Sequence, residues 1–522
     1  MLPALENVKS TASENPVLSF GLTLGFILVL SIRYLRSPWR KLPPGPPGIP
    51  LIGNALQLQG MRWLLFSEWR KAYGDIFHLN AAGQSMVIIS RPDIAADLLD
   101  RRAGIYSDRP PNIVGCEIMT GGLLFSFVRY GDIWRRMRKG AHEAVNKVVA
   151  HGLNDYQISE ALALARTGLL NSDAWDECLR GAAASLMLSG LYGEPPLKSE
   201  QDPRVRYINT FNEHLTLSFA PGAYWVELMP WMRHIPSRFA AWKRSAEAWH
   251  RSSSDEFLRL FGRVQEKIAF GEDRASFCST LIHEADRYGL SARENAWLAA
   301  AMYTAGADTT AASMSWWTMA MLAYPDIQAR AQHEIDTVVG RNRVPSYADM
   351  PHLPYISAMV KEVLRWAPVV PLGVAHRSTE DDIYEGYFIP KGTVVIANIW
   401  ELNRDPETYG PDASQFNPAR FLDEKGQLIS GPPGTKEDGH FAFGFGRRVC
   451  VGKHVASNSL FIQIAVSLWS STLSNANNQK IDVEAYQDEG LIVRPQPFQV
   501  VIQPRFPEAL AMLTQECELR NR

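Results

Sequence analysis

The ten residues from Phe443 to Gly452 constrain this chain more than any other part of its 522 residues. They read Phe-Gly-Phe-Gly-Arg-Arg-Val-Cys-Val-Gly, so Cys450 lies in a glycine-rich turn. Gly446 and Gly452 permit backbone geometry and close approaches that a Cβ atom would block. Phe443 can cover the sulfur with an apolar face, and Arg448 offers a planar cation to a carboxylate. The pattern predicts a loop that holds one cysteine in a shielded position. The simpler alternative is a structural cysteine buried in a turn.

The residues after this cysteine read as a helix over positions 454–461. The N-terminal end of a helix presents unpaired amide donors and the positive end of the helix dipole. Both stabilise a thiolate relative to a thiol. We therefore expect the surroundings of Cys450 to favour the ionised sulfur that acts as a metal ligand.

A second motif, Ala-Gly-Ala-Asp-Thr-Thr at 305–310, lies midway along a helical run without proline at 292–324. Gly306 costs about 1 kcal/mol relative to alanine inside a helix, which calls for a compensating role. Thr309 can turn its hydroxyl away from the helix carbonyl toward a bound molecule. Asp308 is placed to relay protons through ordered water. The alternative is a helix–helix contact made by small residues.

These two motifs resemble the cysteine-ligand loop and the oxygen-activation helix of the cytochrome P450 family. The resemblance implies a haem b cofactor whose iron is held by Cys450 as axial thiolate. It implies catalytic roles for Asp308 and Thr309 in proton delivery, and room for dioxygen beside Gly306. Phe443 and Arg448 would then contact the haem, the arginine at a propionate.

Two further segments resemble the propionate-binding parts of the family. Trp134 and Arg138 lie one turn apart in a Trp-x-x-x-Arg sequence, and both can reach a propionate. His376 has the spacing of a propionate-binding position in relatives, with Arg377 as the alternative. Such short patterns are not specific alone, since a solvated basic helix face is the usual reading of Trp-x-x-x-Arg.

Glu362 and Arg365 share one helix face at a spacing of three residues within an apolar stretch, which predicts a buried pair. The same spacing resembles the Glu-x-x-Arg of the family, whose third partner would here be Arg420. The family usually has glutamate where this chain has Ala419. The implied role is structural rather than catalytic.

The N-terminal region predicts a membrane anchor. Residues 17–32 carry no charge and are followed by basic residues at 33, 36, 40 and 41. Because the positive flank follows the apolar run, the positive-inside rule places the rest of the chain in the cytosol. The run is slightly shorter than the roughly 20 residues of a full span. The alternative is a core helix of a soluble protein.

We expect three parts along the chain: an N-terminal membrane anchor with its basic flank at 1–41, a proline-rich hinge at 42–50, and a haem-thiolate monooxygenase catalytic domain at 51–522. The domain should be mainly α with small β-sheets, which is the cytochrome P450 fold, behind a single N-terminal transmembrane helix. Residues 77–90 read as a hairpin, and 388–396, 491–493 and 498–502 as short strands. Residues 327–339 and 353–366 continue the helical pattern.

The resemblance implies a monooxygenase that inserts one oxygen atom from O2 into a lipophilic small molecule, in a style most like fungal secondary metabolism such as terpenoid biosynthesis. The chain has no flavin or nicotinamide motif, so NADPH-derived electrons must come through a separate flavin reductase, which we expect to be bound to the same endoplasmic reticulum membrane. A net charge of −2 gives no signature for nucleic acid. The alternatives are a haem-thiolate isomerase or dehydratase that needs no reductase, and a non-catalytic haem protein.

The sequence also suggests surfaces for the partners. Candidate substrate walls are 113–127, Ala301, Ala305 and 369–374, while the apolar segment 222–235 either enters the bilayer or packs in the core. Basic side chains near the cysteine loop are candidates for reductase docking, although each could be an ordinary solvated charge. They are Arg135, Arg136, Lys139, Arg447 and Lys453.

Overall fold

The structure is a computed structural model that describes residues 37–150, 152–197, 202–219, 223–432, 434–476 and 481–520, together with 20, 21, 23–25, 28, 29 and 32. The basic positions 33 and 36 and much of the expected anchor at 17–32 lie outside these residues. Within the described part of the chain, no helix is both long enough and apolar enough to cross a bilayer.

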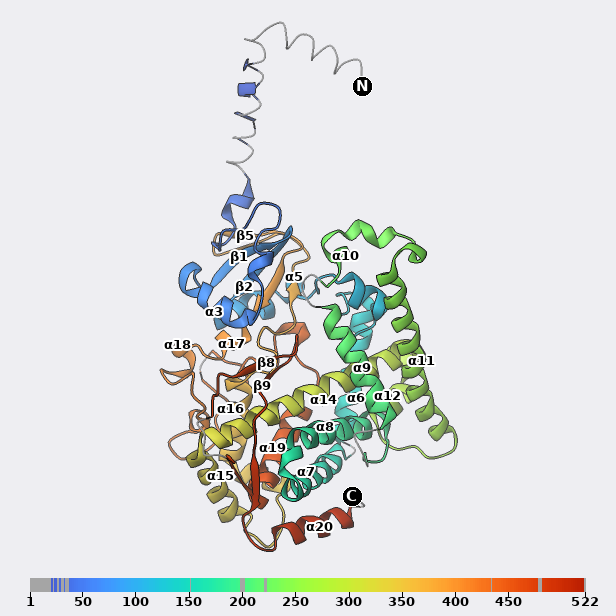
Figure 1. Cartoon of the computed structure of the whole chain (residues 1–522), viewed down its shortest axis with the longest axis vertical. Coiled ribbons are helices and arrows are strands. Elements are labelled where there is room, and N and C mark those ends of the chain that lie inside the picture. Colours follow the sequence, from blue (N-terminus) through green and yellow to red (C-terminus); the bar gives the residue numbers. More distant parts are fainter. Residues whose placement is uncertain are drawn as a thin grey trace.

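The described domain is mainly helical with small sheets, as the sequence predicts (Figure 1). The longer helices are α3 (Arg62–Tyr73), α6 (Asp132–Ala150), α7 (Leu153–Leu170), α8 (Trp175–Tyr192), α9 (Pro203–Ser218), α11 (Ala241–Ala269), α12 (Phe277–His283), α14 (Ala292–Ala323), α15 (Pro325–Val338), α16 (Pro354–Trp366), α19 (Lys453–Ser470) and α20 (Ala509–Leu519). Single-turn helices connect them: α4 (Pro92–Ala95), α5 (Ala103–Tyr106), α10 (Trp225–Leu228), α13 (Ala285–Tyr288), α17 (Ile399–Leu402) and α18 (Pro406–Tyr409).

Helix α14 runs through the middle of the molecule (Figure 1). It begins at a capping box, in which Ser291 and Glu294 satisfy each other's backbone amides. It ends before Pro325, which cannot continue the preceding helix but can begin the next one. Because α14 packs against α8, α11, α16 and α19, it is buried on nearly all sides, which explains its run of apolar residues.

The principal sheet has the strand order β1–β2–β6–β3. Strands β1 (Ile76–Ala81) and β2 (Gln84–Ile89) form the predicted hairpin, with Ala82 and Gly83 at positive φ in its two-residue turn. Strand β6 (Val394–Ala397) is parallel to β2, and β3 (His376–Arg377) is antiparallel to β6.

Three two-stranded sheets complete the fold. They pair β4 (Asp382–Tyr384) with β5 (Tyr387–Ile389), β7 (Ser471–Ser474) with β10 (Val501–Pro504), and β8 (Tyr486–Asp488) with β9 (Val493–Pro495). The two short strands expected within 388–396 are present, but β5 and β6 belong to different sheets. The strand expected at 491–493 lies slightly later in the chain, as β9.

The proline-rich segment 42–50 lies along the outer edge of β1. The amide of His78 donates to the carbonyl of Pro44 at 2.8 Å, and Asn54 donates to the carbonyl of Pro46 at 3.2 Å. A Cβ at Gly45 would lie 1.7 Å from the carbonyl oxygen of His78, so only glycine permits this approach. The segment is therefore fixed to the sheet through these backbone contacts.

Candidate active site

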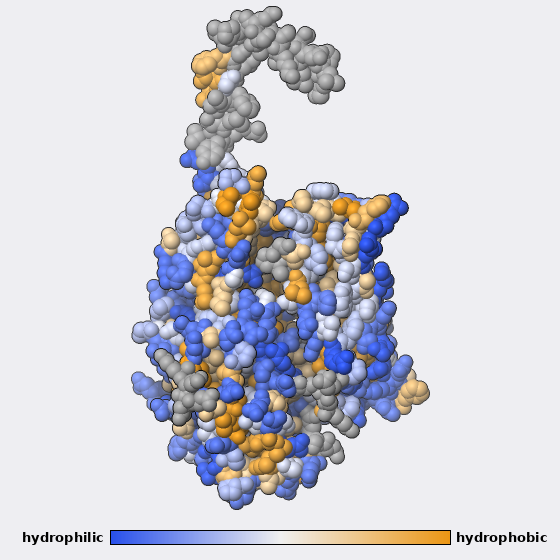
Figure 2. Space-filling view, viewed as in Figure 1, coloured by the Kyte–Doolittle hydropathy of each residue, from blue (hydrophilic) through white to orange (hydrophobic). Residues whose placement is uncertain are grey.

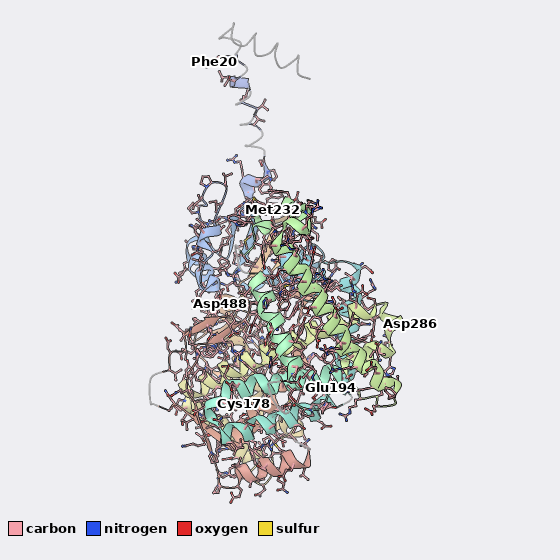
Figure 3. All side chains as sticks on the ribbon, turned by 45° about the vertical axis from the view of Figure 1, so that its right-hand side comes forward. Phe20, Cys178, Glu194, Met232, Asp286 and Asp488 are labelled. Carbon is pink, nitrogen blue, oxygen red and sulfur yellow. The ribbon has the colours of Figure 1, made fainter. Side chains whose placement is uncertain are left out.

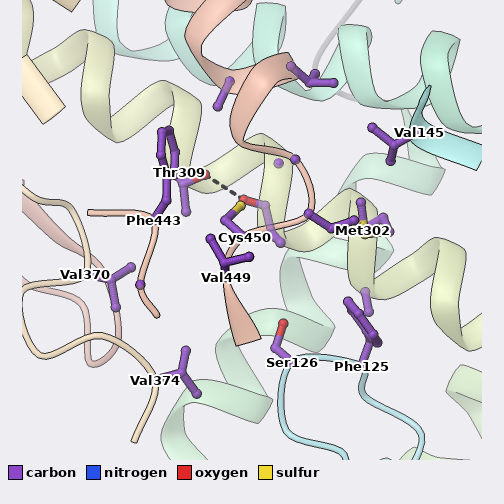
Figure 4. Close-up of a pocket in the computed structure, with 18 of the residues that line it drawn as sticks. Phe125, Ser126, Val145, Met302, Thr309, Val370, Val374, Phe443, Val449 and Cys450 are labelled. Carbon is purple, nitrogen blue, oxygen red and sulfur yellow. Dashed lines mark hydrogen bonds between the residues drawn. The ribbon is translucent and has the colours of Figure 1, made fainter. Parts of the chain in front are cut away.

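A cavity of about 310 Å³ lies between α14, α6, the segment 369–376 and the loop that carries Cys450 (Figure 4). Its wall is mainly apolar and includes Phe125, Ala301, Met302, Ala305, Val370 and Val374. Of the predicted walls, 369–374 and both alanines of α14 contribute, whereas only Phe125 and Ser126 of 113–127 do. The cavity also contains Thr309, Phe443 and Cys450 in its lining, so two distant motifs meet there.

Backbone contacts fix the conformation of the cysteine loop. The amide of Cys450 donates to the carbonyl of Phe443 at 2.9 Å, which closes the turn. Gly446 has φ of +54°, and a Cβ there would lie 2.1 Å from the carbonyl oxygen of Leu99. The sequence argument for Gly446 is confirmed. Gly452 differs, because its φ is −91° and a Cβ would meet no protein atom within 4 Å. Contact with another part of the protein therefore does not explain why residue 452 is glycine.

The side chain of Cys450 is accessible and lines the cavity, with protein packed around the loop that carries it. Burial raises the pKa of its thiol, while the amide of Gly452 and the charge of Arg138 lower it. The amide at the start of α19 therefore lowers the pKa of Cys450 as expected, but burial raises this pKa by more. The protein alone favours the thiol, and a bound metal cation would be needed to displace the proton.

Thr309 and Gly306 face the cavity from α14. The hydroxyl of Thr309 donates to the carbonyl of Ala305 at 2.7 Å, which is the dashed line in Figure 4. A Cβ at Gly306 would lie 2.2 Å from Sδ of Met187 on α8. Gly306 therefore serves close helix packing, as the alternative interpretation held, and it also lines the cavity.

Asp308 does not line the cavity. Its Oδ2 accepts a hydrogen bond from Nδ2 of Asn212 on α9 at 3.0 Å. Burial raises the pKa of this carboxyl group. The sequence predicts Asp308 and Thr309 as neighbours in one catalytic unit, and the structure separates their side chains onto different sides of α14.

A group of cationic and polar side chains gathers at one part of the cavity wall. Trp134, Arg138, His376 and Arg448, all predicted from the sequence, line the cavity together with Arg109, which was not. The guanidinium groups donate to backbone carbonyls: Arg138 to Val449, Arg448 to Ser107 and Val128, and Arg109 to Ser126, Val374 and Ala375. The guanidinium of Arg448 also lies over the ring of Trp134 at 4.3 Å.

These cations have no carboxylate in contact among the described residues, and no aspartate or glutamate lines the cavity there. Burial lowers the pKa of Arg448 to about 9 and the pKa of Arg109 well below its ordinary value. Nη1 of Arg448 is buried without a hydrogen-bond partner in this part of the chain. Buried cations of this kind call for an anionic partner. A ligand with two carboxylates and an apolar body, such as haem, fits this wall, the space beside Gly452 and the sulfur of Cys450.

His376 and Arg377 are neighbours on β3 and point to opposite faces. His376 is buried, lines the cavity and pairs its Nδ1 with the carbonyl of Tyr106 at 2.7 Å. Arg377 lies outside the cavity lining, with Nη1 3.8 Å from Asp108. The geometry favours His376 over Arg377 as the residue that faces a ligand.

Sequence reasoning missed Arg109 and Met187. Arg109 follows Ser107-Asp108 and precedes two prolines, a context that gives no sign of burial. It reaches the cavity only because the chain at 105–108 lies beside β3, where Asp108 bridges to Arg377. No spacing rule would have identified these residues, because they come together through tertiary packing.

The predicted Glu362–Arg365 pair is fully buried, and Arg420 completes it as expected. Of the candidate docking charges, Arg135, Lys139 and Arg447 are exposed, while Lys453 pairs with Asp438 at 3.1 Å and Arg136 with Asp132 at 2.9 Å.

Comparison with known proteins agrees with this geometry. A model of the cytochrome P450 family matches residues 43–502. A cytochrome P450 monooxygenase of Armillaria gallica is 55% identical over 494 residues, covering 94% of this chain and 95% of that protein. Cytochrome P450 monooxygenase 58 of Postia placenta is 43% identical, covering 97% and 96%, and cytochrome P450 monooxygenase iboC of Amanita muscaria is 38% identical, covering 92% and 94%.

Proposed function

The chain belongs to the cytochrome P450 family of haem-thiolate monooxygenases, and on that premise we propose that Cys450 binds the haem iron and that the enzyme inserts one oxygen atom from O2 into an uncharged, lipophilic small molecule. The observation that carries this proposal is the position of Cys450 in a mainly apolar cavity whose charged groups are all cationic. The cations match the two carboxylates of the haem, which leaves no charged group to select a charged substrate.

The site residues have three proposed roles: to hold the haem carboxylates, to supply the sulfur ligand, and to position the reactants. Arg109, Arg138, His376 and Arg448, with the indole of Trp134, would hold the haem carboxylates, and Cys450 would supply the axial sulfur. When bound, the haem activates O2 with electrons delivered from a redox partner, and an axial thiolate favours cleavage of the O–O bond.

The remaining residues position the reactants. Thr309 can exchange its bond to the carbonyl of Ala305 for one to a molecule in the cavity, because Thr309 itself lines the cavity. The apolar residues that face Thr309 exclude bulk water, so protons must pass along fixed groups. Asp308, adjacent to Thr309 in sequence, is the carboxyl group proposed for this purpose.

The substrate is proposed to be a neutral apolar compound of fungal secondary metabolism, such as a terpenoid. The support is the apolar wall together with the fungal origin of the relatives at 38–55% identity. Ser126 supplies a hydroxyl that points into the cavity (Figure 4). It offers one hydrogen bond to an otherwise apolar molecule.

Attachment to the endoplasmic reticulum membrane by a single N-terminal span, with the catalytic domain in the cytosol, belongs to the same proposal. Besides the apolar run at 17–32, the support is a group of exposed apolar side chains on α10, η6 (Pro230–His234) and η7 (Ser237–Phe239). Trp225, Trp231 and Phe239 are 69%, 65% and 71% exposed, which favours a surface role over core packing. Apolar residues gather at this end of the molecule in Figure 2, and Figure 3 labels Met232 of η6 there.

A membrane-bound NADPH-dependent flavin reductase is the proposed electron donor. The exposed cations Arg135, Lys139 and Arg447 are the candidates for its docking. An isomerase or dehydratase would need no such donor, so NADPH consumption that depends on substrate and added reductase distinguishes the two classes.

The first experiment is a ferrous–CO difference spectrum of the full-length protein and of Cys450→Ala. A thiolate-type Soret band in the native protein that disappears in Cys450→Ala is the expected result. Cys517→Ala, in a buried position on α20 remote from the cavity, is the control and should retain the band. A thiolate-type band in Cys450→Ala would overturn the assignment of the ligand.

A further inference from the structure

The hydrogen bond between Asn212 and Asp308 joins α9 to α14 at the carboxyl group closest in sequence to Thr309. Gly306 and Thr309, on either side of Asp308 in the helix, line the cavity, whereas Asp308 does not. The side chain of Asp308 is therefore held on the side of α14 that faces α9. An acid in this position delivers protons to the cavity only after it changes its orientation.

Several charged or titratable groups surround Asp308. They are Arg180 of α8, Tyr303 of α14, and Glu489 and Arg494 of the β8–β9 hairpin. Burial raises the pKa of Asp308, and the charge of Arg180 and the hydrogen bond from Asn212 lower it. Asn212 thus stabilises the ionised carboxylate in the outward orientation.

The outer side of this cluster reaches solvent. Arg180 pairs with Asp176 at 3.0 Å and with Glu489 at 3.4 Å, and the side chains of these carboxylates are 52% and 32% exposed. The hydroxyl of Tyr303 is buried and has no hydrogen-bond partner among the described residues. Buried polar groups without protein partners are usually satisfied by ordered water. Because Asp176 and Glu489 reach solvent, this cluster is the side from which water would supply protons to Asp308.

We propose that Asn212 is a positioning residue for proton delivery, which holds the carboxylate of Asp308 toward the solvent-connected cluster and away from Thr309. The inference rests on the proposed roles of Asp308 and Thr309. In each delivery, a carboxylate oxygen takes a proton from water of the outer cluster. The side chain then turns about its Cα–Cβ bond and gives the proton to water beside the hydroxyl of Thr309. Asp308 returns as a carboxylate to the amide of Asn212.

Asn212 lies on α9, and the end of this helix contacts the cavity wall near Phe125 and Ser126. Helix α9 ends at Ser218, and the next residue, Phe219, stacks on Phe127 with ring centroids 4.7 Å apart. Phe127 directly follows the cavity-lining residues Phe125 and Ser126. A ligand that displaces this part of the wall would move the end of α9, and with it the donor that holds Asp308.

The test measures the carboxyl group directly in the full-length ferric holoenzyme. The infrared C=O band of protonated Asp308, identified by its loss in Asp308→Asn, is titrated in native protein and in Asn212→Leu. Leucine keeps the approximate size of asparagine but donates no hydrogen bond, so the titration midpoint should move to higher pH. Asn212→Gln keeps the amide donor and should restore the midpoint at least in part.

A second readout uses added flavin reductase and NADPH. The fraction of electrons lost as hydrogen peroxide should change by about fivefold in Asn212→Leu, the change expected for one lost hydrogen bond, with an altered pH profile. Asn209→Leu is the matched control, because Asn209 lies on the same helix and is exposed, and it should leave both readouts unchanged.

The inference is overturned if Asn212→Leu retains a thiolate-type ferrous–CO band with an unchanged midpoint and an unchanged pH profile of peroxide loss. Failure of the proposed function looks different, because the thiolate-type band would then be absent from the native protein as well.

Discussion

Nε of Arg420 lies 3.1 Å from Oε1 of Glu362, and both side chains are almost completely removed from solvent. The other carboxylate oxygen of Glu362 accepts from Arg365 at 2.7 Å. Arg365 donates in addition to the carbonyls of Asn403, Ala413 and Gln415. One carboxylate and its two arginines therefore connect α16 to residues 403–420. Within this segment, Asn403 accepts from the amide of Phe441, which precedes the cysteine loop, at 2.9 Å.

Removal of this carboxylate should be strongly destabilising. Glu362→Gln leaves the buried guanidinium of Arg365 without a carboxylate and leaves Arg420 with Asp412 alone. Breaking a buried pair in this way costs about 3–5 kcal/mol in the free energy of unfolding. Thermal or urea unfolding of the haem-loaded protein measures the loss. The control is Glu68→Gln, which removes an exposed pair with Lys71 and should cost less than about 1 kcal/mol. Equal effects of the two substitutions would contradict a special role for the buried network.

Thr309→Ala should uncouple NADPH consumption from product formation. The hydroxyl of Thr309 is exposed to the cavity and exchangeable, and a positioned proton-transfer group contributes at least about 10-fold to rate. Thr309→Ser keeps a hydroxyl and should retain most of the coupling. Thr337→Ala removes a hydroxyl with the same helical bond to a carbonyl, on exposed α15, and serves as control. Normal coupling in Thr309→Ala would exclude the proposed role.

Acid should destabilise the fold through two buried histidines. Burial lowers the pKa of His376 and of His440 to about 3, from an ordinary value of 6.5. Between these two values the unfolded chain binds protons that the folded protein does not. The free energy of unfolding is therefore highest above the unfolded value and falls as the pH drops toward about 3, by up to about 1.4 kcal/mol per pH unit for each histidine.

His440 permits a selective test of this slope. Nδ1 of His440 accepts from the amide of Ala442 at 3.2 Å, and the side-chain oxygen of asparagine can take over that bond. His440→Asn should therefore reduce the number of protons taken up on acid unfolding by about one, measured from the pH dependence of urea unfolding. Thr337→Ala, which removes a side chain that does not titrate from an exposed position on α15, should leave the slope unchanged.

The sequence predicts those parts of the site whose chemistry is local. The cysteine turn, the hairpin at 76–89 and α14 follow from glycine positions, alternation and a helical run without proline, and each is present. Asp308 shows the limit of such reasoning: its place in the motif is local, but its orientation depends on Asn212, which is 96 residues away in the chain. Arg109 and Met187 likewise enter the cavity wall through packing between distant elements. Gly306 meets two requirements: it lines the cavity, and it permits the close contact with Met187 of α8.

Glu227 connects the segment after α9 to the segment that precedes α6. Its two carboxylate oxygens accept from the amides of Ile113 and Val114 at 2.9 and 2.8 Å, at the start of η4 (Ile113–Met119). A second link joins Arg233 of η6 to Glu117 of η4 at 3.0 Å. Since η4 leads directly to the cavity wall at Phe125, the carboxylate of Glu227 fixes a loop that borders the site.

Loss of these bonds should loosen η4 without loss of the fold. In Glu227→Ala, hydrogen exchange of the amides of Ile113 and Val114 should accelerate by about fivefold each, because each loses a hydrogen bond of about 1 kcal/mol. Glu227→Gln retains one carbonyl oxygen and should release only one of the two amides. Glu213→Ala, an exposed glutamate on α9, should change neither. If both amides stay protected in Glu227→Ala, other contacts hold η4, and the carboxylate of Glu227 is not what fixes it.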